Sequence, residues 1–249
     1  MKVDLCLPVY NEAKILEANA KKLLEYCLTA GFPFEWRVVL VINGSSDESL
    51  LIAKKVRSEL PGLVEVVEFK EKGRGFAIKK YWLDSPADIV AYMDTDLAVS
   101  LTHIKKLISS IADEGFDLAI GSRLLPESKI ERSFGREMVS QSYIFLSRLI
   151  LNHRFSDLQC GFKAVKRESF LKVAPYIKGK NWFFDTELIV FSKHCGLRVK
   201  EVPVEWEENR YDQRRSKVNV LRDSFGFLME ILVLRLRIMG INGQNKPIK

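Results

Sequence analysis

The sequence lacks the cysteine and histidine patterns that mark disulfide scaffolds and common metal sites. Its four cysteines contain no C-x-x-C pair and are scattered along the chain: Cys6, Cys27, Cys160 and Cys195. The three histidines, His103, His153 and His194, show no metal-ligand spacing. We therefore expect reduced thiols in a cytoplasmic protein and histidines that lie on the surface or in helices.

The chain also has no long hydrophobic run. A membrane-spanning helix needs about 18 consecutive apolar residues, and the closest segment, 225–234, is shorter and contains Glu230. The first residues are too few and too charged for the apolar part of a signal peptide. The segment 225–234 belongs to a predicted amphipathic helix over 218–241, which suits either a membrane surface or the protein core.

The composition is that of a globular protein with a sizeable core. Its 249 residues are 47% hydrophobic and 29% charged, and they contain no internal repeat. This length fits one large domain, which we place at 1–217; the helix and tail over 218–249 either belong to it or associate with a membrane. The formal net charge of +7 permits an anionic partner, such as a nucleotide, a phosphorylated substrate, an acidic membrane or nucleic acid.

Short apolar segments alternate with helical patterns through the first half of the chain. Strands are predicted at 3–7, 37–42, 63–69, 88–93 and 117–120, and helices at 12–30, 45–60, 76–83 and 101–114. Ser45 and Glu48 are expected to form a capping box for the second helix. Repeated β-α-β units predict an α/β fold with a Rossmann-like, mostly parallel sheet and helices on both faces.

The second half of the chain is less regular. The patterns predict a loop at 126–133, helices at 137–152 and 186–195, and a turn and strand within 156–166. A further strand at 197–206 is interrupted by Pro203, and a charged segment follows before the amphipathic helix.

Two carboxylates follow the apolar strand at 88–93. Asp94 and Asp96 are spaced i, i+2, so on an extended chain they point to the same side. Open α/β sheets bind their ligands just beyond the carboxyl ends of the strands. Two hard oxygen donors at that place suit Mg²⁺ or Mn²⁺ holding a substrate diphosphate.

Three more polar loops follow predicted strands and should meet at the same sheet edge. They are 8–12, 43–47 and 72–75, and with 94–96 they surround one predicted cleft. A base and ribose need polar loop groups, and a diphosphate needs a metal and cations. The four loops contain these residue types.

These loops resemble the motifs of the inverting family 2 glycosyltransferases, which have the GT-A fold. The matching segments are LPVYNE at 7–12, NGSSD at 43–47, KGxG at 72–75 and DTDL at 94–97. Four later segments look like the dolichyl-phosphate sugar transferases: GSR at 121–123, DLQCGFK at 157–163, WFFDTEL at 182–188 and VPVEW at 202–206. The second and third of these are closer to the glucosyl than to the mannosyl branch. The resemblance covers residues 2–237 approximately.

The resemblance implies a role for each candidate site residue. Asp96 is expected to bind the metal directly, with Asp94 beside the ribose and metal. The nucleotide sugar would be held by these two aspartates and by Pro8, Tyr10, Glu12, Asn43, Lys72, Arg210, Arg214 and Lys217. Arg123, Arg136 and Ser216 would hold the acceptor phosphate, since the planar fork of arginine binds phosphate in a bidentate way. Asp94, Asp96, Arg123, Arg136 and Lys217 form the predicted catalytic set.

One position departs from the family pattern. Ile42 and Asn43 stand where the family usually carries an acidic residue that can contact the base. An asparagine can still hydrogen-bond a base edge, so the choice between UDP and GDP stays open.

The expected acceptor is a polyprenyl or dolichyl phosphate at the cytosolic face of a membrane. A lipid phosphate is already ionised near neutral pH, so it can attack the anomeric carbon without a catalytic base. The expected product is an inverted hexose (glucose or mannose) on the lipid, made by a peripheral membrane enzyme.

Three alternatives differ in the site they require. An enzyme that glycosylates a glycan or protein hydroxyl needs a base, which could be Asp185 or Asp157. A nucleotidyltransferase needs a Gly-rich phosphate loop after the first strand, which 8–11 is not. A nucleic-acid binder is disfavoured, because Asp94 and Asp96 would repel a phosphate backbone. The sequence leaves the oligomeric state open.

Overall fold

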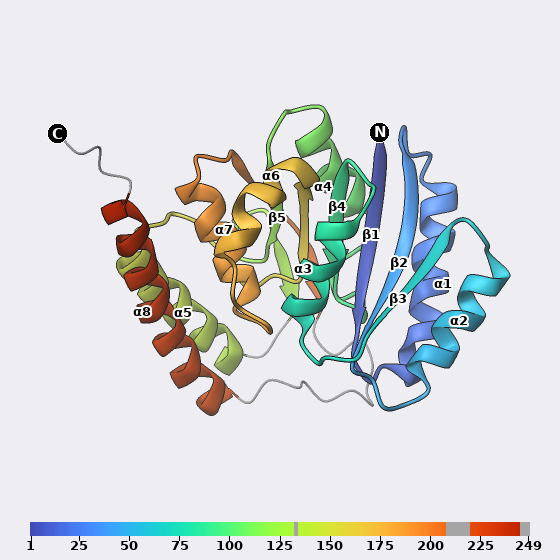
Figure 1. Cartoon of the computed structure of the whole chain (residues 1–249), viewed down its shortest axis with the longest axis horizontal. Helices are drawn as coiled ribbons and strands as arrows, with labels where there is room; N and C mark the ends of the chain where they lie inside the picture. The colour runs from blue at the N-terminus through green and yellow to red at the C-terminus, as the bar shows by residue number, and fades with distance from the viewer. Residues whose placement is uncertain (132–133, 208–219, 245–249) are drawn as a thin grey trace.

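Seven strands form the central sheet of the computed structural model, in which residues 1–131, 134–207 and 220–244 are described (Figure 1). Side chains are described for these residues except 131, 134–140, 220–225, 227 and 242–244. The strands lie in the order β3-β2-β1-β4-β7-β5-β8. Their bounds are β1 Lys2–Val9, β2 Glu35–Asn43, β3 Val64–Phe69, β4 Ile89–Met93, β5 Leu118–Ser122, β7 Phe162–Lys166 and β8 Val199–Pro203.

The sheet is mostly parallel, which confirms the prediction. Strands β1 to β4 run in one direction, and β5 is parallel to β8. Only β7 among these strands is reversed, being antiparallel to both of its neighbours, β4 and β5. As a result, the loop before β7 lies at the same edge as the loops that follow β1, β2 and β4.

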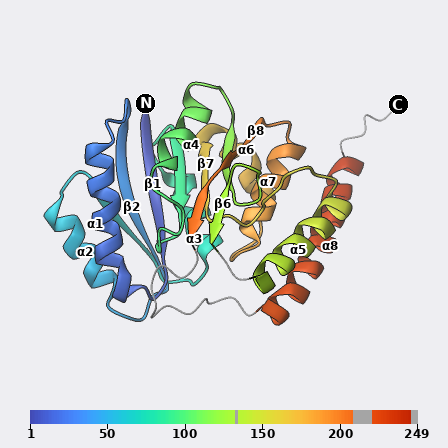
Figure 2. The same ribbon diagram turned by 180° about the vertical axis from the view of Figure 1, so that it is seen from behind.

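Helices cover both faces of the sheet (Figures 1 and 2). The helices on one face are α1 Ala13–Thr29, α2 Ser49–Glu59 and α4 His103–Ala112. Those on the other are α3 Arg74–Asp84, α6 Arg167–Val173 and α7 Phe184–His194, with a 3₁₀ turn at Ala174–Tyr176. Alternate residues of each strand supply the two cores: Leu5 and Leu7 of β1 face one, and Cys6 faces the other. This double burial explains why the strands are continuously apolar.

Two predictions for the second half are wrong, and one helix was missed. Part of the predicted loop at 126–133 is a short strand, β6 Lys129–Glu131, which pairs with β9 Glu205–Glu207. The single strand expected at 197–206 is therefore two strands in two sheets, divided after Pro203. Helix α6 was not predicted, since seven residues are too few to show a helical period.

The last helix packs beside a helix far from it in the sequence. Helix α8, Val220–Gln244, lies along α5, Phe134–Leu151, at one end of the molecule (Figures 1 and 2). One stripe of α8 is buried in the core through Ile231, Leu234 and Ile238. The opposite stripe leaves large apolar side chains exposed, as does α5. We call these residues the α5/α8 apolar surface: Phe145, Leu146, Leu149, Met229, Leu232, Val233, Leu236 and Met239.

Helix α8 is thus both a core helix and a surface helix, whereas the sequence had left these as alternatives. Within the described part of the chain, no helix combines the length and the apolar character needed to cross a membrane. The domain boundary predicted after residue 217 lies outside the described residues.

Candidate active site

The predicted site loops meet at the carboxyl edge of the parallel strands, the lower edge in Figure 1. The loops after β1 and β2 are joined by side-chain hydrogen bonds. Ser45 Oγ accepts a hydrogen bond from the Asn11 backbone N–H at 3.1 Å, and Asn11 Oδ1 accepts one from the Ser46 N–H at 2.8 Å. Asn11 has a positive φ of 52°, a conformation that asparagine tolerates better than most residues.

The expected capping box at Ser45 and Glu48 is wrong. Helix α2 begins at Ser49, and Glu48 makes no side-chain capping bond. Asp47 takes that place, because its carboxylate accepts hydrogen bonds from the N–H groups of Ser49 and Ala13, both at 3.0 Å. One carboxylate therefore caps the first turns of α1 and α2 together and fixes the two loops to each other.

Asn43 ties the first loop to the third. Its Nδ2 donates to the Val9 carbonyl at 2.8 Å, and its Oδ1 accepts from the Gly73 N–H at 3.4 Å. The side chain is buried, and both ends of its amide contact the backbone. A base contact by Asn43 stays a prediction. Close by, the Lys72 ammonium lies 4.2 Å from the centre of the Tyr10 ring. Two residues predicted to bind the nucleotide sugar therefore lie together.

Asp94 and Asp96 lie directly after β4, as predicted. Thr95 between them is buried and donates to the Pro8 carbonyl at 2.8 Å, which fixes this turn against β1. Burial raises the pKa of Asp94; Arg74 opposes that change, and the negative charges of Asp96 and Asp185 add to it.

Arg74 is a site residue that the sequence reasoning missed. Its Nη1 donates to Asp94 Oδ1 at 2.8 Å, its Nη2 pairs with Asp185, and its guanidinium stacks on the Trp182 ring at 4.2 Å. The side chain is only 10% exposed. The available signal was the basic residue between Gly73 and Gly75, which was treated as the variable position of the KGxG motif.

Asp185 is the centre of a buried charge cluster beneath Asp94. It is 0% exposed and pairs with Arg74, with Lys163 at 2.9 Å, and with the Tyr92 hydroxyl, which donates to it. Burial, followed by the charge of Asp185, raises the pKa of Tyr92, so this hydroxyl stays protonated and remains a donor. Lys163 comes from β7 and Asp185 from α7, so the cluster links the sheet to the helices above it.

Arg123 is paired with Asp157. Its Nε and Nη2 donate to the two carboxylate oxygens of Asp157 at 2.7 and 3.1 Å. Burial alone would raise the pKa of Asp157, but Arg123 holds it down to about 2. Among the described residues, Nη1 of Arg123 has no hydrogen bond, so one donor of the predicted acceptor arginine is still available.

Several predicted residues cannot be placed relative to this group. Arg136 belongs to α5, but its side chain lies outside the described part. Arg210, Arg214, Ser216 and Lys217 also lie outside the described residues. Pro8 lies near the end of β1, and Tyr10 and Glu12 follow that strand, at the same edge as Asp94.

The carboxylates suit a hard divalent cation that is shared with a substrate. Asp94 lies against Gly161, where an added Cβ would overlap its carboxylate; only glycine leaves the room it occupies. Within the described residues, no group of three or more His, Cys, Asp or Glu side chains could hold a metal ion. In this part of the chain, Asp94 and Asp96 would therefore be the two ligating side chains, which fits Mg²⁺ or Mn²⁺ completed by phosphate oxygens and water.

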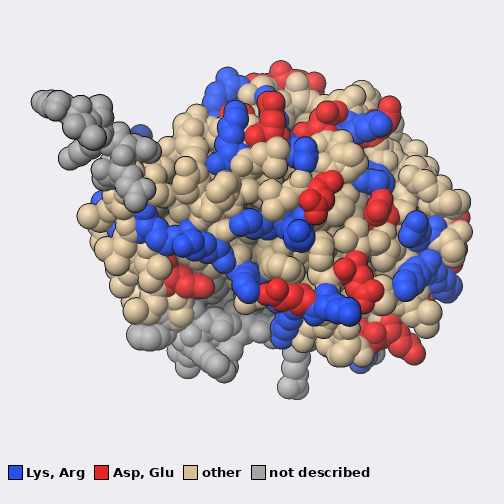
Figure 3. All heavy atoms as spheres, viewed as in Figure 1, with Lys and Arg blue, Asp and Glu red and all other residues tan. Residues whose placement is uncertain are grey.

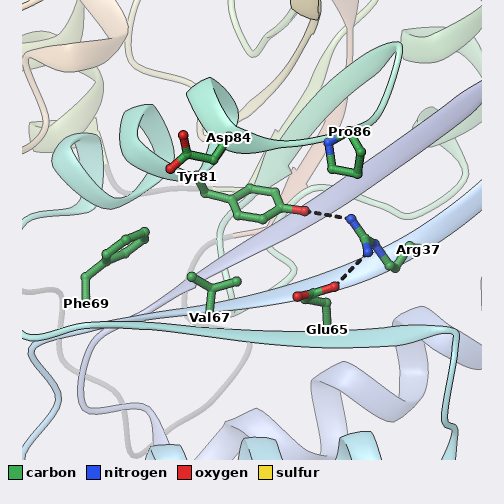
Figure 4. Close-up of a pocket in the computed structure, with 7 residues that line it drawn as sticks. All are labelled: Arg37, Glu65, Val67, Phe69, Tyr81, Asp84 and Pro86. Carbon is green, nitrogen blue, oxygen red and sulfur yellow. Dashed lines mark hydrogen bonds and ion pairs between the residues drawn. The ribbon is translucent and has the colours of Figure 1, made fainter.

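A pocket of about 340 Å³ lies elsewhere, along strand β3 and against the end of α3 (Figure 4). Its lining includes Arg37, Glu65 and Tyr81, and Arg37 is neutralised by Glu65 at 2.7 Å and by Asp4 at 3.1 Å. No predicted site residue lines it. The carboxyl edge of the sheet remains the candidate active site, because it carries the Asp94 and Asp96 carboxylates, which can bind a metal, and the charged side chains around them.

Comparisons with known proteins show which family the chain belongs to. The model of the family described as "Glycosyl transferase family 2" matches residues 4–173. The chain is 33% identical over 233 residues to Glycosyltransferase AglD of Haloferax volcanii, covering 93% of this chain but 36% of that protein. It is 26% identical to a dolichyl-phosphate beta-glucosyltransferase of Saccharomyces cerevisiae, covering 98% of this chain and 77% of that protein.

A solved structure shows the same fold. Glucosyl-3-phosphoglycerate synthase from Mycobacterium tuberculosis, crystallised with Mn²⁺, UDP-glucose and glycerol 3-phosphate, aligns with a TM-score of 0.66 and 17% identity. The alignment covers 96% of this chain and 80% of that one. The fold is of the GT-A type, as predicted. Because the family model matches more than half of the chain, this protein belongs to glycosyl transferase family 2 and is a glycosyltransferase.

Proposed function

We propose that this glycosyltransferase moves a hexose from a nucleotide sugar to a polyprenyl phosphate, with inversion at the anomeric carbon. The relatives named dolichyl-phosphate beta-glucosyltransferase support this acceptor class, and they favour glucose over mannose. The UDP-glucose in the crystals of the mycobacterial synthase favours UDP over GDP.

The observation that carries the proposal is the state of the two possible catalytic bases. An enzyme that glycosylates a hydroxyl needs a carboxylate to remove a proton. Asp185 is fully buried among Arg74, Lys163 and Tyr92, and Asp157 is buried and paired with Arg123. Neither is a free base at the surface of the site. An ionised phosphate nucleophile does not need one.

Catalysis would then consist of positioning and charge stabilisation. Asp94 and Asp96 would hold Mg²⁺ or Mn²⁺, which neutralises the leaving diphosphate when bound. Pro8, Tyr10, Glu12, Asn43 and Lys72 would contact the nucleotide, with Arg210, Arg214 and Lys217 added from the segment after β9. Arg123, Arg136 and Ser216 would orient the acceptor phosphate.

We further propose that the α5/α8 apolar surface rests on the membrane that holds the acceptor. The lipid tail of a polyprenyl phosphate stays in the bilayer, so the enzyme must approach its surface. Leu149 is 73% exposed and Leu236 67% exposed, and the basic residues Arg148 and Arg235 are exposed beside them. The α5/α8 end of the molecule is mostly tan in Figure 3, with both basic and acidic side chains next to it. Apolar side chains flanked by arginines suit an anionic lipid surface, here the cytosolic face.

A transfer assay tests the function. Purified protein is incubated with labelled UDP-glucose, GDP-mannose or other sugar nucleotides, with Mg²⁺ or Mn²⁺, and label is counted in the organic phase. Dolichyl phosphate should accept the sugar, whereas dolichol, which has a hydroxyl in place of the phosphate, should not. Transfer to dolichol or to a glycan, with none to dolichyl phosphate, would overturn the proposal.

The metal ligands are tested in the same assay. Asp96→Asn should nearly abolish transfer with the fold intact, because a neutral amide is a poor ligand for a hard cation, and EDTA should do the same to the wild type. Asp88→Asn is the matched control, since Asp88 is exposed and directly precedes the amino-terminal end of β4, away from the site. Full activity in EDTA would contradict the metal assignment.

A further inference from the structure

Arg74 lies directly beside one of the two proposed metal ligands. Its guanidinium contacts the Asp94 carboxylate at 2.8 Å, and Asp94 is one of the two proposed metal ligands. The other side of that carboxylate is closed by Gly161. A cation that approaches Asp94 therefore meets a carboxylate that already has a positive partner.

The position of Arg74 is fixed from three directions. Its Nη2 pairs with the buried Asp185, and its plane stacks on Trp182. Gly75, the next residue, packs against the 179–181 segment so closely that a Cβ there would lie 2.8 Å from the Asn181 carbonyl oxygen. The Nε atom of Arg74 is buried without a hydrogen-bond partner among the described residues. The guanidinium is therefore held in place by its ion pairs and not by a full set of hydrogen bonds.

The charges of this cluster leave little attraction for a metal alone. Among the described residues, two cations, Arg74 and Lys163, are opposed by three carboxylates, Asp94, Asp96 and Asp185. These five groups together carry one net negative charge, and a divalent ion would make their sum positive. A nucleotide diphosphate would bring negative charge as well as the oxygen ligands that the two aspartates cannot supply.

We propose that Arg74 is a resident cation that competes with the divalent metal for Asp94, so that the metal binds tightly only together with the nucleotide diphosphate. The inference rests on the metal site proposed at Asp94 and Asp96. Arg74 is a positioning residue, since it acts through Asp94. It keeps Asp94 in one orientation before the substrate arrives, and it prevents the site from holding a metal without a donor.

The test measures Mn²⁺ binding directly, without turnover. Free Mn²⁺ is followed by electron paramagnetic resonance during titration of the wild type and variants, alone and with saturating UDP or GDP. Arg74→Gln removes the charge and keeps most of the side-chain volume, whereas Arg74→Lys keeps the charge. Arg37→Gln is the matched control, because it removes an aspartate-paired arginine at the opposite edge of the sheet.

For the wild type we expect weak binding of Mn²⁺ alone and much tighter binding with the nucleotide. Arg74→Gln should bind Mn²⁺ alone on the order of tenfold more tightly, because one charge a few ångströms away in a partly buried site is worth at least that factor. In Arg74→Gln, the increase in Mn²⁺ affinity caused by the nucleotide should be smaller by the same factor. Turnover should fall, because Asp94 loses its orientation. Arg74→Lys and Arg37→Gln should keep the wild-type affinity for Mn²⁺ alone.

The direction of the change in Mn²⁺ affinity separates competition by Arg74 from a purely structural role of this residue. Damage to the fold would weaken Mn²⁺ binding, whereas loss of a competing cation strengthens it. Circular dichroism checks each variant, and Arg74→Met, which keeps the packing on Trp182, replaces Arg74→Gln if that variant is unfolded. An affinity for Mn²⁺ alone that is unchanged or lower in the neutral variant overturns the inference. A wild type that binds no Mn²⁺ with either nucleotide overturns the metal site itself, and the inference with it.

Discussion

The pair formed by Arg123 and Asp157 gives a quantitative prediction. Asp157→Asn keeps the shape of the side chain but removes its charge, so the buried Arg123 loses its partner. The two contacts of 2.7 and 3.1 Å make the pair bidentate, and the side chains are 14% and 1% exposed. Removing one member of such a buried pair leaves an uncompensated charge, which costs about 3–5 kcal/mol.

The pKa of Asp157 gives a second estimate of the same interaction. It is lowered from 3.8 to about 2, which corresponds to about 2 kcal/mol of stabilisation at neutral pH. This value is smaller because the pKa is a net result: burial, its largest influence, raises the pKa and offsets part of the lowering by Arg123. We therefore expect Asp157→Asn to lower the free energy of unfolding by about 2–4 kcal/mol.

Urea denaturation at neutral pH, followed by circular dichroism, measures this change as a shift of the midpoint.

The lowered pKa of Asp157 also fixes how this contribution to stability depends on pH. A carboxyl group whose folded-state pKa is lowered stabilises the protein above its unfolded pKa, so the contribution of Asp157 is complete above pH 4 and is lost as the pH falls towards 2. The difference between wild type and variant should shrink over that window. A loss below 1 kcal/mol at neutral pH would refute the reasoning, since it would put the pair in the range of exposed salt bridges, about 0–1 kcal/mol.

Two further predictions concern the acceptor and the membrane. Arg123→Ala and Arg136→Ala should each reduce use of dolichyl phosphate by about tenfold or more, because a charge-assisted hydrogen bond contributes about 1.5–3 kcal/mol. The affinity for UDP or GDP, measured by calorimetry, should change little, and Asp157→Asn serves as the control for the stability lost at Arg123; loss of nucleotide affinity in both arginine variants would move the acceptor site elsewhere. Leu232→Glu/Leu236→Glu should abolish cosedimentation with anionic liposomes while the protein stays folded, whereas Leu51→Glu on α2, an exposed apolar residue outside this surface, should not. A double variant that still binds the liposomes, or one that changes only the self-association of the protein, would assign the α5/α8 apolar surface to another partner.

Much of the fold and part of the site follow from the sequence alone. The strands from β1 to β4 are marked by short apolar runs, and the helices between them by apolar residues at helical spacing. Because consecutive β-α-β units make parallel strands, the loops at Asn11, Asn43 and Asp94 had to meet at one edge. This reasoning needs only local patterns and a rule of connectivity. It therefore worked where the chain is regular and failed at β6, β9 and α6, which are too short to show a period.

The tertiary structure decided which charged groups act on one another. Arg74 and Asp185 are 111 residues apart, and no pattern along the chain links them. The reversal of β7 places Gly161 against Asp94, although a chain of β-α-β units would have predicted a parallel strand there. The packing of α8 on α5 likewise decides which apolar residues are buried and which remain exposed. Sequence periodicity records which side of an element is apolar, but ion pairs and exposed surfaces depend on contacts between distant segments, and only the folded chain fixes these.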